Sequence, residues 1–461
     1  MYLSKKIDIF ISIIVFTLST MISVFVAYNV AHPGYRNLFL LPLIYGVVYV
    51  IFISPIRRRL NNIFIHVFIA VSFTRYVILP LLITMTKYYG GRSTIPPLSE
   101  SFHSAIYLMS YELIIVSLFT FIIFKNYKKP SNRLNKVLKP PSSIFIYILF
   151  ISLSFGMTTL FPQALKSFSF LKVSDDFRDF GQGPLFVTLL TYCLVIAKYL
   201  IFIIILNLLN KKFTSSGNKF YIFLSFLLVL FSISIYFGDN RADFIITAIA
   251  SILLFFKLYP QVIKRSLIPF LLSILLVTSF INDQRNHASL SGGEDKLLDV
   301  TSTLQIYLGG PYNVAIAIEA AHLNEGERKL WHLGHELLRP VLGLNLILKE
   351  IDIKPSSTFF NERIFFSDHV SQIIPIIGQG YFYLGFLFSP IIMILYLLLV
   401  KYFIKIQDNH NRIDMYFFLS IPIARIGFAM GQNGSILAND ISFFLLLFII
   451  IYYINNRLKV K

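Results

Sequence analysis

A late polar segment of the chain carries two imidazoles, a carboxylate and a guanidinium at helical spacing. His332, His335 and Arg339 stand at positions i, i+3 and i+7, and Glu336 lies beside them. In a helix this spacing places the side chains on one stripe. Two interpretations stay open: the stripe faces a substrate chamber, or it is the wet face of an interfacial amphipathic helix whose other side lies on lipid.

The same residues begin a motif that is typical of zinc proteases, His335-Glu336-Leu337-Leu338-Arg339. Arg339 stands where that motif has its second histidine. Zinc needs three or more protein ligands, and a cation at this position repels the metal. No metal site is therefore expected.

Three arginines are predicted to lie at one depth, near the outer boundary between membrane and water. Arg241 opens a helix that also carries Asp243, Arg285 follows a hydrophobic run, and Arg425 precedes a glycine-rich stretch. Guanidinium groups bind phosphate oxygens in a bidentate fork, so this cluster suits an anionic head group. The alternative is that each arginine only snorkels to the boundary.

Ionisable side chains also fall inside apolar runs, at Arg75, Glu112, Lys198 and Arg425. A charge in hydrocarbon is costly unless it faces a partner or a wet cavity, so these residues are candidates for function. For Arg75 and Glu112 the alternative is an ion pair that holds two helices together.

Hydropathy predicts the elements that position these residues. Of the 461 residues, 56% are hydrophobic and 14% are charged, whereas soluble domains carry about 25% charged residues. Apolar runs of about 20 residues can cross a bilayer as helices. We therefore predict an all-α polytopic integral membrane protein with about twelve transmembrane helices, at 7–28, 37–55, 61–88, 102–124, 143–161, 185–209, 219–237, 241–257, 266–282, 375–400, 413–430 and 436–454.

The formal net charge of +18 follows the predicted topology. Basic residues gather in alternate loops, and the positive-inside rule then places both termini in the cytoplasm. The basic balance is thus explained without a nucleic-acid partner.

One long outward-facing loop, residues 283–374, separates the ninth span from the tenth, whereas nearly every other predicted outer loop is short. It holds 12 of the 23 acidic residues, 5 of the 9 histidines and the only tryptophan, Trp331. Loops this long are usually functional or disordered, and the many Leu, Ile, Val and aromatic residues argue against disorder. The predicted domains are the membrane region 1–282, this large extracytoplasmic loop and the membrane region 375–461.

Two helices are predicted at or near the membrane surface within the loop. The first covers Tyr312–Leu323, where Glu319 and His322 share a face. The second covers Leu330–Glu350, and Pro340 should kink or end it.

The layout resembles that of the Wzy-type oligosaccharide repeat-unit polymerases. The matching features are Arg241 in a Gly-x-x-Arg turn, Arg285 after the following span, one large outer loop before the last three spans, the exit of that loop through Ile374-Pro375-Ile376-Ile377-Gly378-Gln379-Gly380-Tyr381-Phe382-Tyr383-Leu384-Gly385, and Arg425-Ile426-Gly427 in the penultimate span. The histidine–asparagine motif of the related O-antigen ligases is missing, which favours a polymerase over a ligase.

The resemblance implies a glycosyltransferase of the bacterial cell membrane that joins repeat units into a capsule, O-antigen or exopolysaccharide. Donor and acceptor are oligosaccharides linked to undecaprenyl pyrophosphate, and no cofactor or metal is expected. A chain-length regulator and a flippase are the protein partners that the resemblance suggests.

The resemblance also assigns roles to residues. The pyrophosphate leaving group needs positive charge, expected from Arg241, Arg285 and Arg425. Further contacts to pyrophosphate or sugar are expected from Arg75, Arg339 and Arg363. A base must take the proton of the acceptor hydroxyl, for which His335 is the first choice and His369, Asp243 and Asp283 are the reserves.

Three other interpretations stay open, and one of them is a structural or scaffold membrane protein, which would not require buried Arg75, Lys198 and Arg425. A ligase shares the donor and differs in the acceptor. A flippase for lipid-linked oligosaccharides is a transporter of similar span number, for which pseudo-symmetric halves and mostly short loops are expected. The amount of folded chain in the late polar segment therefore discriminates between enzyme and flippase.

Overall fold

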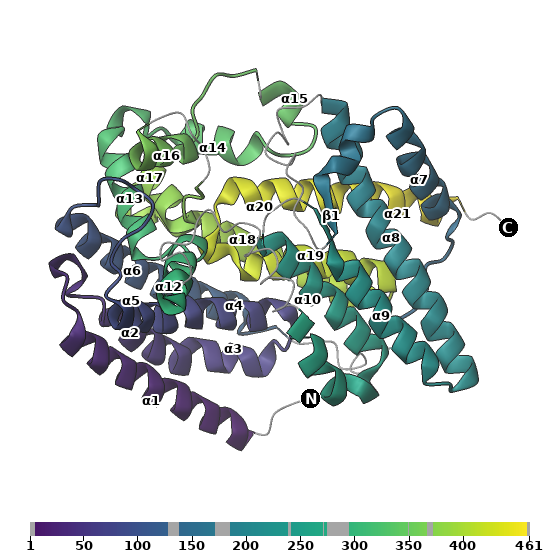
Figure 1. The fold of residues 1–461 in the computed structure, drawn as a ribbon, viewed down its shortest axis with the longest axis horizontal. Helices are drawn as coiled ribbons and strands as arrows, with labels where there is room; N and C mark the ends of the chain where they lie inside the picture. Colours follow the sequence, from purple (N-terminus) through teal and green to yellow (C-terminus); the bar gives the residue numbers. More distant parts are fainter. Residues whose placement is uncertain are drawn as a thin grey trace. The chain divides into compact units, whose positions relative to one another are not determined.

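The computed structural model describes residues 5–127, 138–170, 185–237, 241–270, 272–273, 295–348, 350–366 and 372–458. Helices account for nearly all the regular structure in these ranges (Figure 1). The two strands found there, β1 (Phe168–Phe170) and β2 (Ile235–Phe237), pair antiparallel, with Phe168 opposite Phe237. The prediction of a helical fold is confirmed, with this short strand pair as the addition.

Six helices of the described ranges are long and apolar enough to cross a membrane: Lys6–Asn29, Pro33–Arg59, Ile63–Thr86, Ser99–Phe124, Phe186–Ser216 and Gly434–Arg457. Two further helix pairs are equally apolar but bent, Phe244–Leu258 with Pro260–Phe270 by 107° and Ile376–Phe388 with Ile391–Asn409 by 105°. These are the helices of a multi-pass membrane protein with six to eight candidate spans. The count of twelve and the orientation of the termini stay predictions.

The predicted span 375–400 is interrupted at Gly385, whose φ of 71° and ψ of −172° are non-helical, and again at Pro390. Helix α17 (Ile376–Phe388) ends before Pro390, and α18 (Ile391–Asn409) begins directly after it. Because proline lacks an N–H and restricts the residue before it, a straight helix does not continue through this position. The run is a bent pair of helices rather than one straight span.

Two of the predicted spans, 143–161 and 219–237, correspond to shorter helices. These are α7 (Phe145–Gly156) and α9 (Phe220–Ser234). At 1.5 Å per residue they are roughly 18 and 22 Å long, against about 30 Å of hydrocarbon. The apolar run is present in both places, but the regular helix is shorter than a bilayer is thick.

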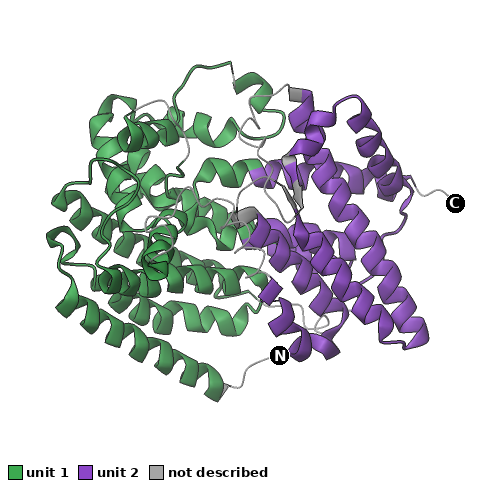
Figure 2. Cartoon of the chain, viewed as in Figure 1, with its two compact units in different colours: residues 1–131, 289–403, 425–439 green, residues 132–288, 404–424, 440–461 purple. Residues whose placement is uncertain are grey.

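Packing divides the chain into two compact units, each built from segments that are distant in sequence (Figure 2). Unit 1 comprises residues 1–131, 289–403 and 425–439, and unit 2 comprises residues 132–288, 404–424 and 440–461. The predicted boundaries at 282 and 374 followed membrane topology and stay predictions. By packing, residues 289–374 of the predicted loop, the late polar segment, belong with the first four candidate spans.

Unit 1 consists of helices from three separate parts of the chain, and its last part ends at residue 439. They are α1 (Lys5–Asn29), α2 (Leu40–Val48), α3 (Ser54–Arg59), α4 (Ile63–Phe73), α5 (Leu79–Thr86), α6 (Ser99–Phe124), α12 (Lys296–Tyr307), α13 (Pro311–Leu323), α14 (Leu330–Leu338), α15 (Asn345–Leu348), α16 (Ser356–Phe365), α17, most of α18 and the start of α20 (Gly434–Ile441). Short π-helical turns join α2 to α3 and α4 to α5.

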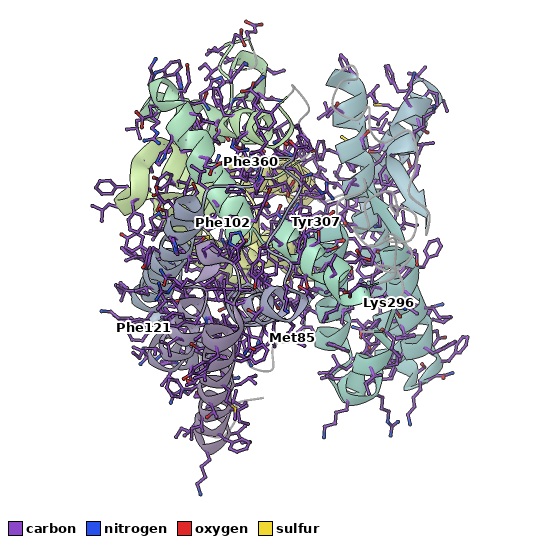
Figure 3. The ribbon with its side chains drawn as sticks, turned by 60° about the vertical axis from the view of Figure 1, so that its left-hand side comes forward. Met85, Phe102, Phe121, Lys296, Tyr307 and Phe360 are labelled. Atoms are coloured by element: carbon purple, nitrogen blue, oxygen red, sulfur yellow. The ribbon has the colours of Figure 1, made fainter. Side chains whose placement is uncertain are left out.

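Helix α13 is the buried centre of unit 1. It packs against α6, α16 and α17, and its side chains from Tyr312 to Ile318 are buried. At the contact with α17, a Cβ on Gly378 would come within 2.6 Å of the Ala317 Cβ; small residues permit this close approach. Phe102 of α6 and Phe360 of α16 are buried in the same unit (Figure 3). The helix predicted at Tyr312–Leu323 is confirmed. It lies in the core of unit 1, whereas it was expected at or near the membrane surface.

Unit 2 is built around α8 (Leu185–Ser216), which packs against α7 and α9. It also contains α10 (Arg241–Leu258), the two strands, most of α19 (Ile413–Gly427) and α21 (Leu447–Arg457). Tyr147 of α7 donates to the Asp414 carboxylate of α19 at 2.7 Å, and Arg412 pairs with the same carboxylate. This buried polar contact joins the first and second segments of the unit.

Candidate functional site

Glu336 of α14 is the centre of a buried polar cluster in unit 1. Its Oε2 accepts hydrogen bonds from the Ser356 backbone N–H at 2.7 Å and the Tyr383 hydroxyl at 2.5 Å. Its Oε1 accepts from the Gln379 amide at 2.8 Å and from the hydroxyls of Ser356 and Ser435 at 3.0 and 3.3 Å. We call these five residues the Glu336 cluster. It joins α14 to α16, α17 and α20.

The carboxylate charge in this cluster is balanced by neutral donors. Within the described ranges, no lysine, arginine or histidine forms an ion pair with Glu336. Ser356 is the first residue of α16, so the carboxylate also lies at the positive end of a helix. Hydrogen bonds to an ionised acceptor are stronger than those between neutral groups. The Glu336 carboxylate is therefore held in one position, and both of its oxygens already accept hydrogen bonds from the protein.

The two histidines of the predicted stripe face the protein interior. His335 Nε2 lies 2.9 Å from the Leu348 carbonyl oxygen, and His332 Nδ1 lies 3.0 Å from the Glu327 carbonyl oxygen. A carbonyl only accepts, so each of these nitrogens carries a proton. For a neutral His335, Nδ1 is then the nitrogen with the free lone pair. The stripe is thus not a wet face, because both imidazoles and Glu336 are buried.

The predicted helix Leu330–Glu350 ends early. Helix α14 stops at Leu338, Arg339 is its C-terminal cap, and α15 begins only at Asn345. Pro340 explains the stop, as predicted from its missing N–H. Arg339 is partly exposed at this helix end.

Sequence reasoning assigned no role to the partners of Glu336. Gln379 and Tyr383 stood in the quoted run at the loop's exit, but only as part of a motif. Ser356 and Ser435 carried no signal, because isolated serines are common in loops and helices. The one available hint was Gln379 itself, an amide between two glycines in an apolar run, which must find hydrogen bonds if it is buried.

Arg75 is completely buried, and each of its three guanidinium nitrogens donates hydrogen bonds within the protein. Its Nη1 donates to Glu112 Oε2 at 2.7 Å and to the Tyr76 hydroxyl at 3.1 Å, while Nε and Nη2 donate to the Gly309 carbonyl at 3.2 and 3.0 Å. Tyr76 donates to the same carboxylate oxygen at 2.8 Å. The ion pair that the sequence raised as the alternative for Arg75 is present, and it ties α4–α6 to the turn before α13.

Arg363 of α16 also lies in an ion pair. Its Nε and Nη2 contact Glu319 Oε2 at 2.9 and 2.5 Å, and both side chains are nearly buried. The other carboxylate oxygen of Glu319 accepts from the Leu98 backbone N–H and the Ser101 hydroxyl, each at 2.8 Å. His322, which shares the face of Glu319, lies 3.0 Å from the Tyr381 hydroxyl. These contacts hold α13 and α16 to the start of α6.

The predicted arginine cluster is only partly within the described residues. Arg425 lies in the last turn of α19 and is buried. The backbone of Arg241 and Asp243 forms the first turn of α10, but their side chains lie outside the description. Arg285, His369 and Asp283 lie outside the described residues altogether. The proximity of the three arginines therefore stays a prediction.

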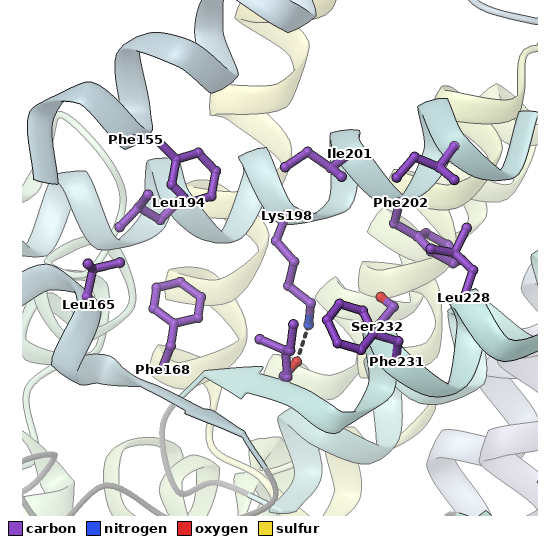
Figure 4. Close-up of a pocket in the computed structure, with 12 residues that line it drawn as sticks. Phe155, Leu165, Phe168, Leu194, Lys198, Ile201, Phe202, Leu228, Phe231 and Ser232 are labelled. Atoms are coloured by element: carbon purple, nitrogen blue, oxygen red, sulfur yellow. Dashed lines mark hydrogen bonds between the residues drawn. The ribbon is translucent and has the colours of Figure 1, made fainter. Parts of the chain in front are cut away.

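Unit 2 contains an apolar cavity of about 300 Å³ beside α8 (Figure 4). Its walls are apolar except for Lys198 and Ser232, and they include Phe155 of α7, Phe168 of β1 and Phe231 of α9. The Lys198 ammonium donates to the Ile235 carbonyl of β2, and no carboxylate pairs with it in the described part of the chain. An apolar chain that carries an anionic group fits this combination.

No cluster of three or more His, Cys, Asp or Glu side chains with metal-binding geometry occurs among the described residues. No family model, curated protein or solved structure matches the chain. Interpretation of the site thus rests on its own geometry.

Proposed function

We propose that this protein is a glycosyltransferase that polymerises lipid-linked oligosaccharide repeat units into a surface polysaccharide at the outer face of the bacterial cell membrane. The observation that carries the proposal is the folded state of the late polar segment. Its described part forms the five helices α12–α16, which belong to the same compact unit as the first four candidate spans. Mostly short loops are expected of a flippase, so this folded mass favours an enzyme.

The proposed reaction is a substitution at the anomeric carbon of a donor linked to undecaprenyl pyrophosphate. The acceptor hydroxyl oxygen bonds to that carbon, the carbon–oxygen bond to pyrophosphate breaks, and its electron pair leaves with the pyrophosphate. A base takes the hydroxyl proton. We assign this role to Nδ1 of His335, with His369, Asp243 and Asp283 as the reserves.

Positive charge at the leaving pyrophosphate stabilises the transition state. We assign it to Arg241, Arg285 and Arg425, with Arg339 as a further contact because it is partly exposed. Arg75 and Arg363 are already occupied by Glu112 and Glu319, which favours a structural role for both.

The cavity beside α8 supports a lipid-linked substrate. Its apolar walls suit part of a polyprenyl chain, and the side-chain nitrogen of Lys198, which donates to the Ile235 carbonyl, is a hydrogen-bond donor for a phosphate oxygen. At about 300 Å³ it is at the small end of ligand pockets, roughly 300–1,000 Å³, so it would hold a segment of the chain.

The test is complementation of a deletion strain with wild type, His335→Ala or Arg425→Ala. His410→Ala and Arg58→Ala are the matched controls, because both residues are exposed. Surface polysaccharide is separated by length on a gel, and membrane levels of each variant are measured by immunoblot. The proposal expects single repeat units at the surface without the long ladder in the deletion strain and in the two test variants, and a normal ladder in the controls.

Two other outcomes would overturn the proposal. Absence of surface sugar with repeat units trapped inside the cell would indicate a flippase. Full-length chains that remain on the lipid carrier, without transfer to their final acceptor, would indicate a ligase.

A further inference from the structure

The segment from α14 to α15 exposes a row of large apolar side chains. We call this row the apolar ridge: Leu330, Trp331, Leu338, Leu344, Leu346 and Ile347, each between 41% and 71% exposed. The opposite side of α14 carries His332, His335 and Glu336, which are buried together with Leu333. The helix is thus inverted relative to a surface helix in water: its three polar side chains face inward, and Leu330, Trp331 and Leu338 face outward.

The inversion is held in place by the Glu336 cluster. Five hydrogen bonds fix the carboxylate, and His335 is fixed to the Leu348 carbonyl, which also ties α15 to α14. A rotation of α14 that hid the ridge would break all of these contacts and expose buried polar groups without partners. The outward direction of the ridge is thus a property of the fold, and the ridge needs an apolar surrounding.

We propose that the apolar ridge inserts into one leaflet of the membrane that the candidate spans cross. Its place beside a candidate span supports this proposal. Glu336 contacts Gln379 and Tyr383 in the first two turns of α17, the first half of a bent candidate span. An interfacial helix next to such a span buries its apolar face in the boundary of head groups and acyl chains.

The side chains around the ridge fit a lipid boundary. Trp331 is 57% exposed, and the amphipathic indole is enriched at head-group level in membrane proteins. Lys329 is exposed and Arg339 is partly exposed at the two ends of α14; such cations attract anionic lipid head groups. Exposed or partly exposed carboxylates also flank the ridge, with Glu325 and Glu327 before α14 and Glu350 and Asp352 after α15. Lys354, also after α15, pairs with Glu362 at 3.1 Å.

Trp331 provides the test directly, because it is the only tryptophan of the chain. The full-length protein is placed in nanodiscs of phosphatidylcholine and phosphatidylglycerol, with or without bromine on the acyl chains. Insertion predicts a blue-shifted emission maximum, loss of most of the emission in brominated lipid, and little quenching by iodide. The His332 ring lies 4.3 Å from the indole, so every sample is measured in the same buffer.

A matched pair of variants locates the effect. Ile347→Glu places a charge on the ridge and should reduce quenching by brominated lipid, whereas Glu350→Gln, at an exposed position outside the ridge, should not. Trp331→Phe abolishes the signal and gives the background.

Two outcomes would overturn the proposal. Strong iodide quenching without an effect of brominated lipid would show that the ridge faces water. A blue-shifted emission that neither quencher changes would show that protein covers the ridge, for example a second copy of the chain. The measurement needs no sugar substrate, so its outcome is independent of the proposed polymerase activity.

Discussion

Two buried carboxylates of unit 1 take part in the contacts between the late polar segment and the candidate spans, Glu112 through Arg75 and Glu336 directly, and their charges are balanced in different ways. Glu112 pairs with the guanidinium of Arg75, which also donates to the carbonyl of Gly309. Glu336 receives five hydrogen bonds from neutral groups. One attachment depends on a single opposite charge, and the other is distributed over several donors.

This difference determines how each attachment fails. Removal of one partner from a buried ion pair leaves an uncompensated charge, which is far more costly than the loss of one neutral hydrogen bond. A single substitution in the Arg75–Glu112 pair should therefore cause a large loss in the free energy of unfolding. The Glu336 cluster should weaken in steps, because each donor contributes only a part of the total.

The largest effect is expected for Arg75→Met. It leaves the Glu112 carboxylate buried without a cation, so the free energy of unfolding should fall by about 3–5 kcal/mol. Unfolding of the purified protein by titration with a denaturing detergent measures this change. In the double variant Arg75→Met/Glu112→Met both charges are absent, and most of the loss should be recovered. A double variant as unstable as the single one would contradict the ion-pair explanation.

Glu336→Ala should have a smaller effect, about 1–3 kcal/mol, because it leaves neutral donors without an acceptor. Glu336→Gln keeps the shape and one acceptor oxygen, so its effect should be smaller still. Hydrogen exchange gives the location: amides of α14 and α16 should lose protection, while those of α13 should keep theirs. Equal losses in α13 would show that the cluster supports the whole unit rather than the attachment of α14.

The sequence predicted one of these two attachments better than the other. Arg75 and Glu112 are rare charges within apolar runs, and each needs a partner, so their pairing was a defined alternative. The stripe of His332, His335 and Glu336 was also visible, but helical spacing shows only which side chains share a face. The direction of that face depends on Gln379, which is 43 residues from Glu336, and on Ser435, which is 99 residues away.

The helices themselves followed hydropathy, with exceptions at their ends. An apolar run predicts where a helix lies, but a window of about 20 residues averages over a break such as the one at Pro390. The burial of α13 was not predicted either. Its alanines allow close packing with Gly378, and that contact joins segments which hydropathy treats separately.

Loss of a single donor from the Glu336 cluster should cost less than loss of the carboxylate. Tyr383→Phe keeps the ring and removes the bond that its hydroxyl donates to Glu336, together with the weaker one that it accepts from the Ser356 N–H at 3.1 Å. The Ser356 N–H keeps Glu336 as its acceptor, so we expect a loss of about 0.5–1.5 kcal/mol in the same unfolding assay. Tyr28→Phe is the matched control, because Tyr28 is 86% exposed and should show no change. If Tyr383→Phe were as damaging as Glu336→Ala, the cluster would depend on one dominant bond, and the contrast with the ion pair would disappear.

The smallest expected effect is that of a metal chelator on activity. Both buried carboxylates are balanced by groups of the protein, and in the proposed reaction the pyrophosphate is likewise balanced by arginines, which supply positive charge without a metal. Activity with lipid-linked repeat units should therefore be the same with and without EDTA. Arg425→Met should reduce activity in both conditions, and added Mg²⁺ should not restore it. If EDTA abolished activity and Mg²⁺ restored it, a metal rather than the arginines would supply the positive charge at the pyrophosphate. That result would contradict the proposed charge balance.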